Sequence, residues 1–282
     1  MLLPLRYLPH MHNPDVLQMG LSPLPPNCWI EPDLDLPAFH AHKTQQRRLL
    51  GSRVYCAQPE SVAAQQELAT LLFEHLLQDH PEFYAVEGDT LQCAAGAFTV
   101  TRSPEEPLWT ASLSVADDLL LLERRGADYV LTAASLCSPS HWKLEDKLNQ
   151  PMAAIHGVVP GLDQSLQARV QRFFWHLRPG QVVARHNWGL QRGAALCVRE
   201  SGEDSGELHY RSERQTLRRL PLSGAIVFTI RVYLHPLAAL AQIPQALPHL
   251  FSAIDSCPPR LAVYKGFDRL QAALAVFRGR DD

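Results

Sequence analysis

Long hydrophobic runs and an excess of charge of either sign are both missing from this chain. The longest apolar runs, such as residues 225–230 and 119–122, are far shorter than the roughly 20 residues that cross a bilayer. The chain has 26 Lys and Arg against 29 Asp and Glu residues, a net charge of −3, which offers no basic surface for general nucleic-acid binding. The first residues also lack the basic and apolar regions of a signal peptide. We therefore expect a cytoplasmic protein that binds neither membranes nor nucleic acids.

Common metal-binding and nucleotide-binding motifs are missing as well. The 6 cysteines are scattered without a C-x-x-C pair, which excludes a zinc ribbon and a c-type haem attachment site and favours free thiols. No G-x-x-x-x-G-K-S/T, G-x-G-x-x-G, H-E-x-x-H or G-x-S-x-G motif occurs in the sequence. Nucleotide hydrolases, Rossmann dehydrogenases, zincins and α/β-hydrolases are therefore disfavoured.

The hydrophobic residues make up 46% of the 282 positions, which is enough for a sizeable core. Their spacing predicts an α+β fold, because helices and strands do not alternate as they do in a parallel sheet. The strands are therefore expected to form an antiparallel sheet with flanking helices. Helices are predicted at residues 61–78, 162–177, 244–255 and 267–277, and strands at residues 97–101, 119–124, 129–136, 181–188, 194–199, 207–211 and 224–234.

The first part of the chain, residues 1–42, contains a high density of proline. Proline removes a backbone donor and fixes φ, which argues against regular structure. Apolar residues such as Trp29, Ile30 and Phe39 are interleaved with the prolines. We expect an irregular segment that packs on a single domain formed by residues 43–282.

Arginine is concentrated at residues 211–219, between two predicted strands. The planar guanidinium matches carboxylates and phosphates, so an anionic partner is one interpretation of the cluster. On a helical turn, Arg211, Arg214, Gln215 and Arg218 would share one face. A solvated charged surface is the other interpretation.

Histidine offers two kinds of candidate ligand. His10 with His12, and His40 with His42, form H-x-H pairs, a spacing that suits a metal when the residues lie on a strand. Both pairs lie in the proline-rich segment without a nearby carboxylate, which favours exposed or capping histidines. His156 is a lone histidine among apolar neighbours, a pattern typical of a core histidine. It becomes a ligand candidate beside a pocket for an anionic cofactor.

Several sequence blocks occur in the order in which one family has them. The most specific are E-R-Q-T-L-R-R-L-P at 213–221 and F-T-I-R-V-Y at 228–233. Through these blocks the chain resembles the haem-dependent oxidative N-demethylase alpha-subunit-like family over roughly residues 25–275. Ser138 and His141 interrupt the family pattern C-P-S-G-W, which predicts an altered pocket entrance. The other matching blocks are C-S-P-S-H-W at 137–142, I-H-G-V-V-P at 155–160, N-W at 187–188 and Y-K-G at 264–266.

The resemblance implies a PAS-like fold that holds haem b. His156 is then the expected iron ligand, with a Cys137 thiolate as the alternative. The arginines also gain a partner, since Arg214 and Arg218 would clamp the haem propionates. Arg231 would face the same pocket from the strand at 224–234, and Asn187 and Trp188 are further cofactor-binding candidates.

The chemistry that the resemblance implies is oxidative N-demethylation of a small secondary amine by dioxygen. Glu213 is the candidate carboxylate for the cationic amine, and an ion pair with a neighbouring arginine is its alternative role. Trp188 and Trp142 would be pocket walls or plain core residues. No flavin, nicotinamide or iron–sulfur motif occurs, so electrons would come from a flavin or iron–sulfur partner subunit. The rival hypotheses are a non-enzymatic haem PAS sensor and a haem-less interaction protein of the same fold.

Overall fold

The structure is a computed structural model, and it describes residues 5–13, 15, 16, 20–156, 160, 164–200 and 206–279. Its main element is a seven-stranded antiparallel sheet with the strand order β1-β8-β9-β10-β6-β7-β2. A three-stranded sheet, β3-β4-β5, lies apart from it. The predicted α+β class is confirmed, and the PAS-like assignment stays a prediction. The strands are β1 Ser22–Leu24, β2 Tyr55–Ala57, β3 Tyr84–Glu87, β4 Thr90–Cys93, β5 Phe98–Thr101, β6 Asp118–Arg125, β7 Asp128–Ser135, β8 Val182–Arg192, β9 Leu208–Arg219 and β10 Ile226–Pro236.

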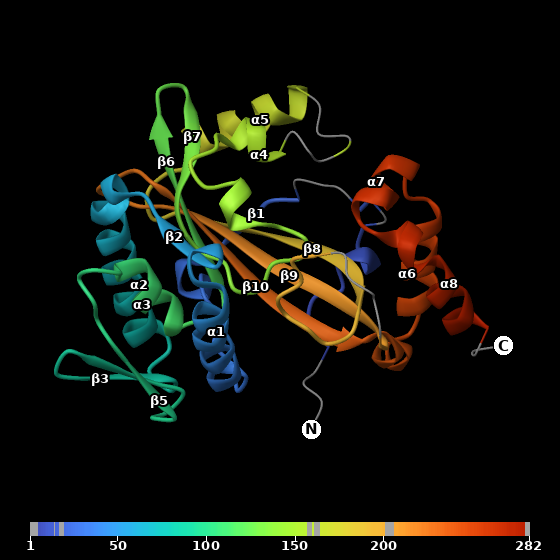
Figure 1. Ribbon diagram of the computed structural model, residues 1–282, viewed down its shortest axis with the longest axis horizontal. Coiled ribbons are helices and arrows are strands. Elements are labelled where there is room, and N and C mark those ends of the chain that lie inside the picture. The colour runs from blue at the N-terminus through green and yellow to red at the C-terminus, as the bar shows by residue number, and fades with distance from the viewer. Residues whose placement is uncertain are drawn as a thin grey trace.

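The helices gather around the two ends of the long strands β8, β9 and β10. Figure 1 shows α1, α2 and α3 with the small sheet on one side and α6, α7 and α8 on the other. Within the described residues, no helix combines the length and hydropathy needed to cross a bilayer. The helices are α1 Leu36–Leu50, α2 Val62–Asp79, α3 Pro107–Leu113, α4 Met152–His156, α5 Gln164–His176, α6 Ala246–Asp255, α7 Pro259–Tyr264 and α8 Phe267–Arg278.

Each strand of the large sheet presents alternate side chains to two different cores. We call one side the α4 face, because Leu120, Leu217 and Ile226 pack there with Ile155 of α4 and with α5. The other side is the α2 face. There Leu119, Leu121, Ala133, Val182 and Val227 pack with Leu68, Leu72 and Leu76, which follow one another at helical spacing along α2.

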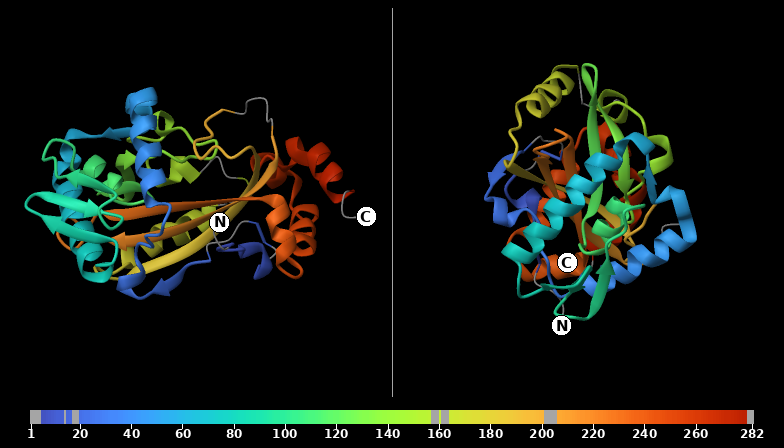
Figure 2. Two further views of the ribbon diagram at one scale, coloured as in Figure 1. Left: turned by 90° about the horizontal axis from the view of Figure 1, so that it is seen from below. Right: turned by 90° about the vertical axis from the view of Figure 1, so that its left-hand side faces the viewer.

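The described residues of the N-terminal segment 5–35, apart from β1 at the sheet edge, lie along the α2 face of β8, β9 and β10 and are dark blue in Figure 2. The Tyr7 ring stacks on His186 of β8 with 4.3 Å between the centroids. The predicted irregular structure is wrong for residues 36–42, which begin α1. Pro37 stands in the first turn of that helix, where a proline costs no hydrogen bond.

The helical turn predicted for the arginine cluster is also wrong. Residues 208–219 form the central strand β9, which pairs with β8 on one side and with β10 on the other. Its arginines therefore alternate between faces: Arg211 and Arg219 point to the α4 face, and Arg214 and Arg218 to the α2 face. The strand predicted at 194–199 is also wrong. Within residues 194–199, all of which the structure describes, Val198 alone forms a β-bridge, to Ser140.

Candidate functional site

The α4 face is only partly covered in the middle of the sheet. On β10, Thr229 and Arg231 of the α2 face are buried, whereas Phe228 and Ile230 of the α4 face are half-buried. Antiparallel sheets can leave one face open to solvent, and half-buried apolar side chains on such a face are a candidate surface for a ligand. We call this area the central strip and define it as Arg185, Asn187, Glu213, Gln215, Phe228 and Ile230, all of which are half-buried.

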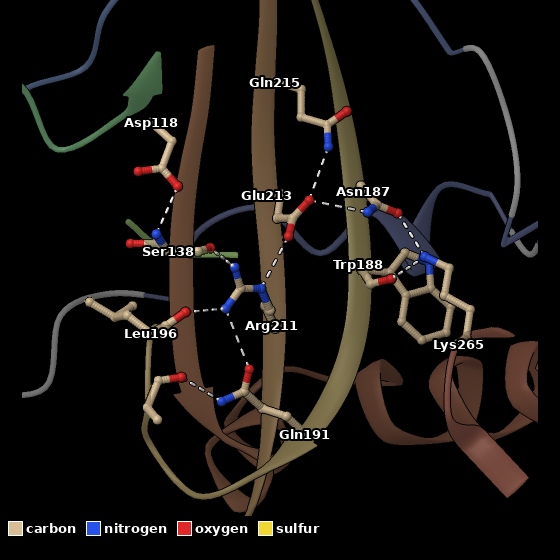
Figure 3. A network of polar contacts seen from close by, with 11 residues as sticks. Asp118, Ser138, Asn187, Trp188, Gln191, Leu196, Arg211, Glu213, Gln215 and Lys265 are labelled. Carbon is tan, nitrogen blue, oxygen red and sulfur yellow. Dashed lines mark hydrogen bonds and ion pairs between the residues drawn. The ribbon is translucent and has the colours of Figure 1, made fainter. Parts of the chain in front are cut away.

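Glu213 is the hub of a polar network in this strip (Figure 3). Its Oε1 accepts a hydrogen bond from Arg211 Nε at 3.1 Å, and its Oε2 accepts from Asn187 Nδ2 at 3.2 Å and Gln215 Nε2 at 2.9 Å. Burial alone would raise the pKa of Glu213, but the charge of Arg211 and these hydrogen bonds outweigh burial and lower the pKa. The carboxylate, 12% exposed, is therefore ionised at neutral pH.

Arg211 connects Glu213 to the chain that follows β7. Its guanidinium donates to the carbonyl oxygens of Ser138 and Leu196, and the backbone N–H groups of Cys137 and Ser138 each donate to Asp118 at 2.8 Å. Burial, followed by the charge of Asp118, raises the pKa of the Cys137 thiol to about 12. Cys137 is thus a protonated thiol at neutral pH in the haem-free chain, and its role as an alternative iron ligand stays a prediction.

Lys265, between α7 and α8, fixes the orientation of Asn187. Its Nζ donates to Asn187 Oδ1 and to the Trp188 carbonyl oxygen, both at 2.8 Å. Because Oδ1 accepts from an ammonium, the amide presents Nδ2 to Glu213. Burial lowers the pKa of Lys265 to about 8, and the nearby Glu213 carboxylate opposes this shift.

Arg185 lies opposite Gln215 in the pairing of β8 with β9, so its side chain belongs to the same face as Glu213. Its Nε is buried, and no hydrogen-bond acceptor among the described residues satisfies it. Burial lowers the pKa of Arg185, with only partial compensation from the charge of Glu213. Neither Arg185 nor Lys265 was predicted as a site residue, although Lys265 belongs to the matching block Y-K-G at 264–266. Alternation along residues 181–188 could have placed Arg185 with Asn187 on one face.

The arginines that were predicted to bind a cofactor face the other way. Arg214 donates to the Trp29 carbonyl oxygen at 3.0 Å and pairs with Glu31 at 3.1 Å. Arg231 pairs with Asp33 at 2.9 Å. These partners belong to the N-terminal segment, so the anionic partner of both arginines is the chain itself.

Arg218 and Trp188 also lie on the α2 face. Arg218 lies over the Trp29 ring, 4.4 Å from its centroid. Trp188 is buried and stacks on Tyr210 and Phe267, which makes it a core residue. Of the expected site residues whose side chains the structure describes, Asn187 and Glu213 meet on the α4 face, whereas Arg214 and Arg231, paired across β9 and β10, meet on the α2 face.

The histidines of the two H-x-H pairs do not form a metal site in the described structure. His10 is buried, with its Nδ1 2.8 Å from Tyr210 Oη, which corrects the expected exposed position. His42 Nε2 lies 2.9 Å from the Cys137 carbonyl oxygen. In the part of the chain that the structure describes, no group of three His, Cys, Asp or Glu side chains could hold a metal ion. His156 ends α4, and its side chain lies outside the described part of the structure.

The fold and the central strip define an α+β protein whose main sheet has helices on both faces and a half-buried ionised carboxylate beside apolar residues. The family model described as haem-dependent oxidative N-demethylase, alpha subunit-like, matches residues 20–275. The chain belongs to this family. The family description implies dependence on haem and an assembly with further subunits.

Proposed function

We propose that the chain binds haem b on the α4 face and catalyses oxidative N-demethylation of a small secondary amine. The observation that carries the proposal is the central strip, where half-buried apolar side chains lie beside the ionised Glu213. In the proposed reaction, the amine, dioxygen, two electrons and two protons give the smaller amine, formaldehyde and water. The electrons are proposed to come from a flavin or iron–sulfur partner subunit, in agreement with the alpha-subunit description of the family.

The residues of the α4 face fit a porphyrin in chemical character. A porphyrin needs apolar surface for its macrocycle and cationic groups for its propionates. Phe228 and Ile230 supply half-buried apolar surface, and Arg185 supplies a guanidinium with a buried, unsatisfied Nε. His156, at the end of α4, is the proposed iron ligand. When bound, haem would supply the oxygen-activating chemistry.

Glu213 is proposed to bind and orient the amine. Secondary amines are cationic at neutral pH, and Glu213 is ionised. The three hydrogen bonds that Glu213 accepts leave room for a fourth, because a carboxylate has about four acceptor positions. The ion pair with Arg211 and the proposed binding of the amine are therefore compatible roles.

The proposed function is tested by reconstituting the full chain with haem and supplying dimethylamine, dioxygen and an artificial electron donor. The expected result is formaldehyde in proportion to the amine consumed, with strongly reduced formation in Glu213→Gln. A haem-loaded chain that forms no formaldehyde and responds only to gases would support the sensor instead. A chain that takes up no haem would support the interaction protein.

A further inference from the structure

Arg185 is an unsatisfied cation on the face where the proposed function places haem. Within the described residues it has no hydrogen-bond acceptor, no ion-pair partner within 4.0 Å and no aromatic ring against its guanidinium. Arg211, Arg214, Arg219 and Arg231 of the neighbouring strands all donate to protein oxygens. The buried Nε is an unsatisfied donor on a half-buried side chain, and an external anion would supply the acceptor that it lacks.

Glu213 is not a hydrogen-bonded anionic partner of Arg185. The Glu213 carboxylate already accepts from Arg211, Asn187 and Gln215, and its charge reaches Arg185 only through space. Asp118, the other carboxylate of the α4 face, accepts the backbone N–H groups of Cys137 and Ser138. In the described part of the chain, neither carboxylate accepts a hydrogen bond from Arg185 Nε.

The position of Arg185 on β8 leaves its side chain accessible to a ligand. The Arg185 side chain is half-buried, and because the pairing of β1 with β8 ends at Ala184, the strand edge beside Arg185 is not covered by β1. Its neighbour across the strand pair is Gln215, which is half-buried, and both belong to the central strip. A ligand lying on Phe228 and Ile230 would therefore have a cation at the β8 side of the sheet.

We infer that Arg185 binds a carboxylate of the ligand on the α4 face, which for haem is a propionate. This inference rests on the proposed function and transfers the propionate contact from Arg214 and Arg218 to Arg185. The planar fork of a guanidinium matches a carboxylate with two parallel hydrogen bonds, which explains an arginine at this position.

The test uses the haem-free full chain and two probes, protoporphyrin IX and its dimethyl ester, with binding measured by quenching of tryptophan fluorescence. Arg185→Gln should bind protoporphyrin IX about 10- to 100-fold more weakly than the wild type, because one charge-assisted contact is lost. The dimethyl ester, which has no carboxylate, should bind the wild type and Arg185→Gln equally. Arg218→Gln is the matched control on the α2 face and should leave both affinities unchanged.

The outcomes separate this inference from the proposed function. Equal affinity of wild type and Arg185→Gln for protoporphyrin IX would overturn the role of Arg185, while the proposed function would stand. A loss in Arg218→Gln instead, or an equal loss for the ester, would also overturn it. Arg185→Lys, which keeps the charge, should recover part of the affinity, and normal binding of the dimethyl ester by Arg185→Gln checks that this variant is folded. If the wild type bound neither porphyrin, the inference and the proposed function would fall together.

Discussion

The N-terminal segment is held on the α2 face by buried ion pairs, and Asp33→Asn tests how much one of them contributes. Arg231 Nη2 donates to both oxygens of Asp33, at 3.0 and 2.9 Å. The Arg231 side chain is 1% exposed and that of Asp33 is 7% exposed. Burial alone would lower the pKa of Arg231, but the charge of Asp33, together with Tyr233, Asp117 and the hydrogen bond to Asp33, outweighs burial and raises the pKa. The surroundings therefore favour the charged arginine.

Asp33→Asn leaves the charge of Arg231 buried without its main counter-charge. Removing one partner of a buried pair costs about 3–5 kcal/mol. Since an asparagine oxygen still accepts one hydrogen bond, we expect a loss of about 3 kcal/mol in the free energy of unfolding, measured by urea denaturation. Asp255→Asn is the matched control, because the Arg278–Asp255 pair is 37% and 57% exposed. Its loss should be about 0–1 kcal/mol.

A double-mutant cycle checks the cause of this loss. Asp33→Asn combined with Arg231→Met should destabilise the chain by less than the sum of the single changes, because no charge remains unpaired. A loss for Asp33→Asn as small as that for Asp255→Asn, or strictly additive losses in the cycle, would refute the reasoning.

Three further predictions concern the α4 face. Glu213→Gln should weaken the binding of dimethylamine to the haem-loaded chain by roughly 10- to 100-fold without changing its haem content, and a normal affinity would exclude an amine-binding role. Lys265 titrates near 8 in the folded chain against 10.5 ordinarily, so between these pH values the unfolded chain binds more protons. The free energy of unfolding, relative to Lys265→Met, should therefore rise with pH by up to about 1.4 kcal/mol per unit, and a falling difference would contradict the burial of Lys265. His156→Ala should abolish specific haem binding, whereas the control variant His176→Ala, at an exposed position, should bind haem normally. Unchanged haem content in both variants would refute the assignment of His156 as iron ligand.

The local spacing of apolar residues was sufficient to predict most of the helices and strands. The strands predicted at 119–124 and 129–136 are β6 and β7, which pair in the expected antiparallel manner. The helix predicted at 61–78 is α2, within one residue at each end. These elements follow from apolar periodicity, which acts over a single helix or strand pair.

The positions of Arg214 and Arg231 could not be predicted from local patterns. Arg214 and Arg231 are buried in a strand environment because Glu31 and Asp33, about 200 positions earlier in the chain, neutralise them. No local pattern contains that long-range pairing, and a solvated helical turn satisfied the same spacing of arginines. Polar side chains of β9 alternate between two environments: Arg214 contacts the N-terminal segment on the α2 face, and Glu213 lies in the central strip on the α4 face.

A visible absorption titration of the haem-reconstituted chain with dimethylamine tests the central claim most directly. If haem and amine share the α4 face, the Soret band should appear on reconstitution and shift saturably as the amine is added. A Soret band that ignores the amine, or no specific band at all, would contradict a haem-dependent N-demethylase site on this face.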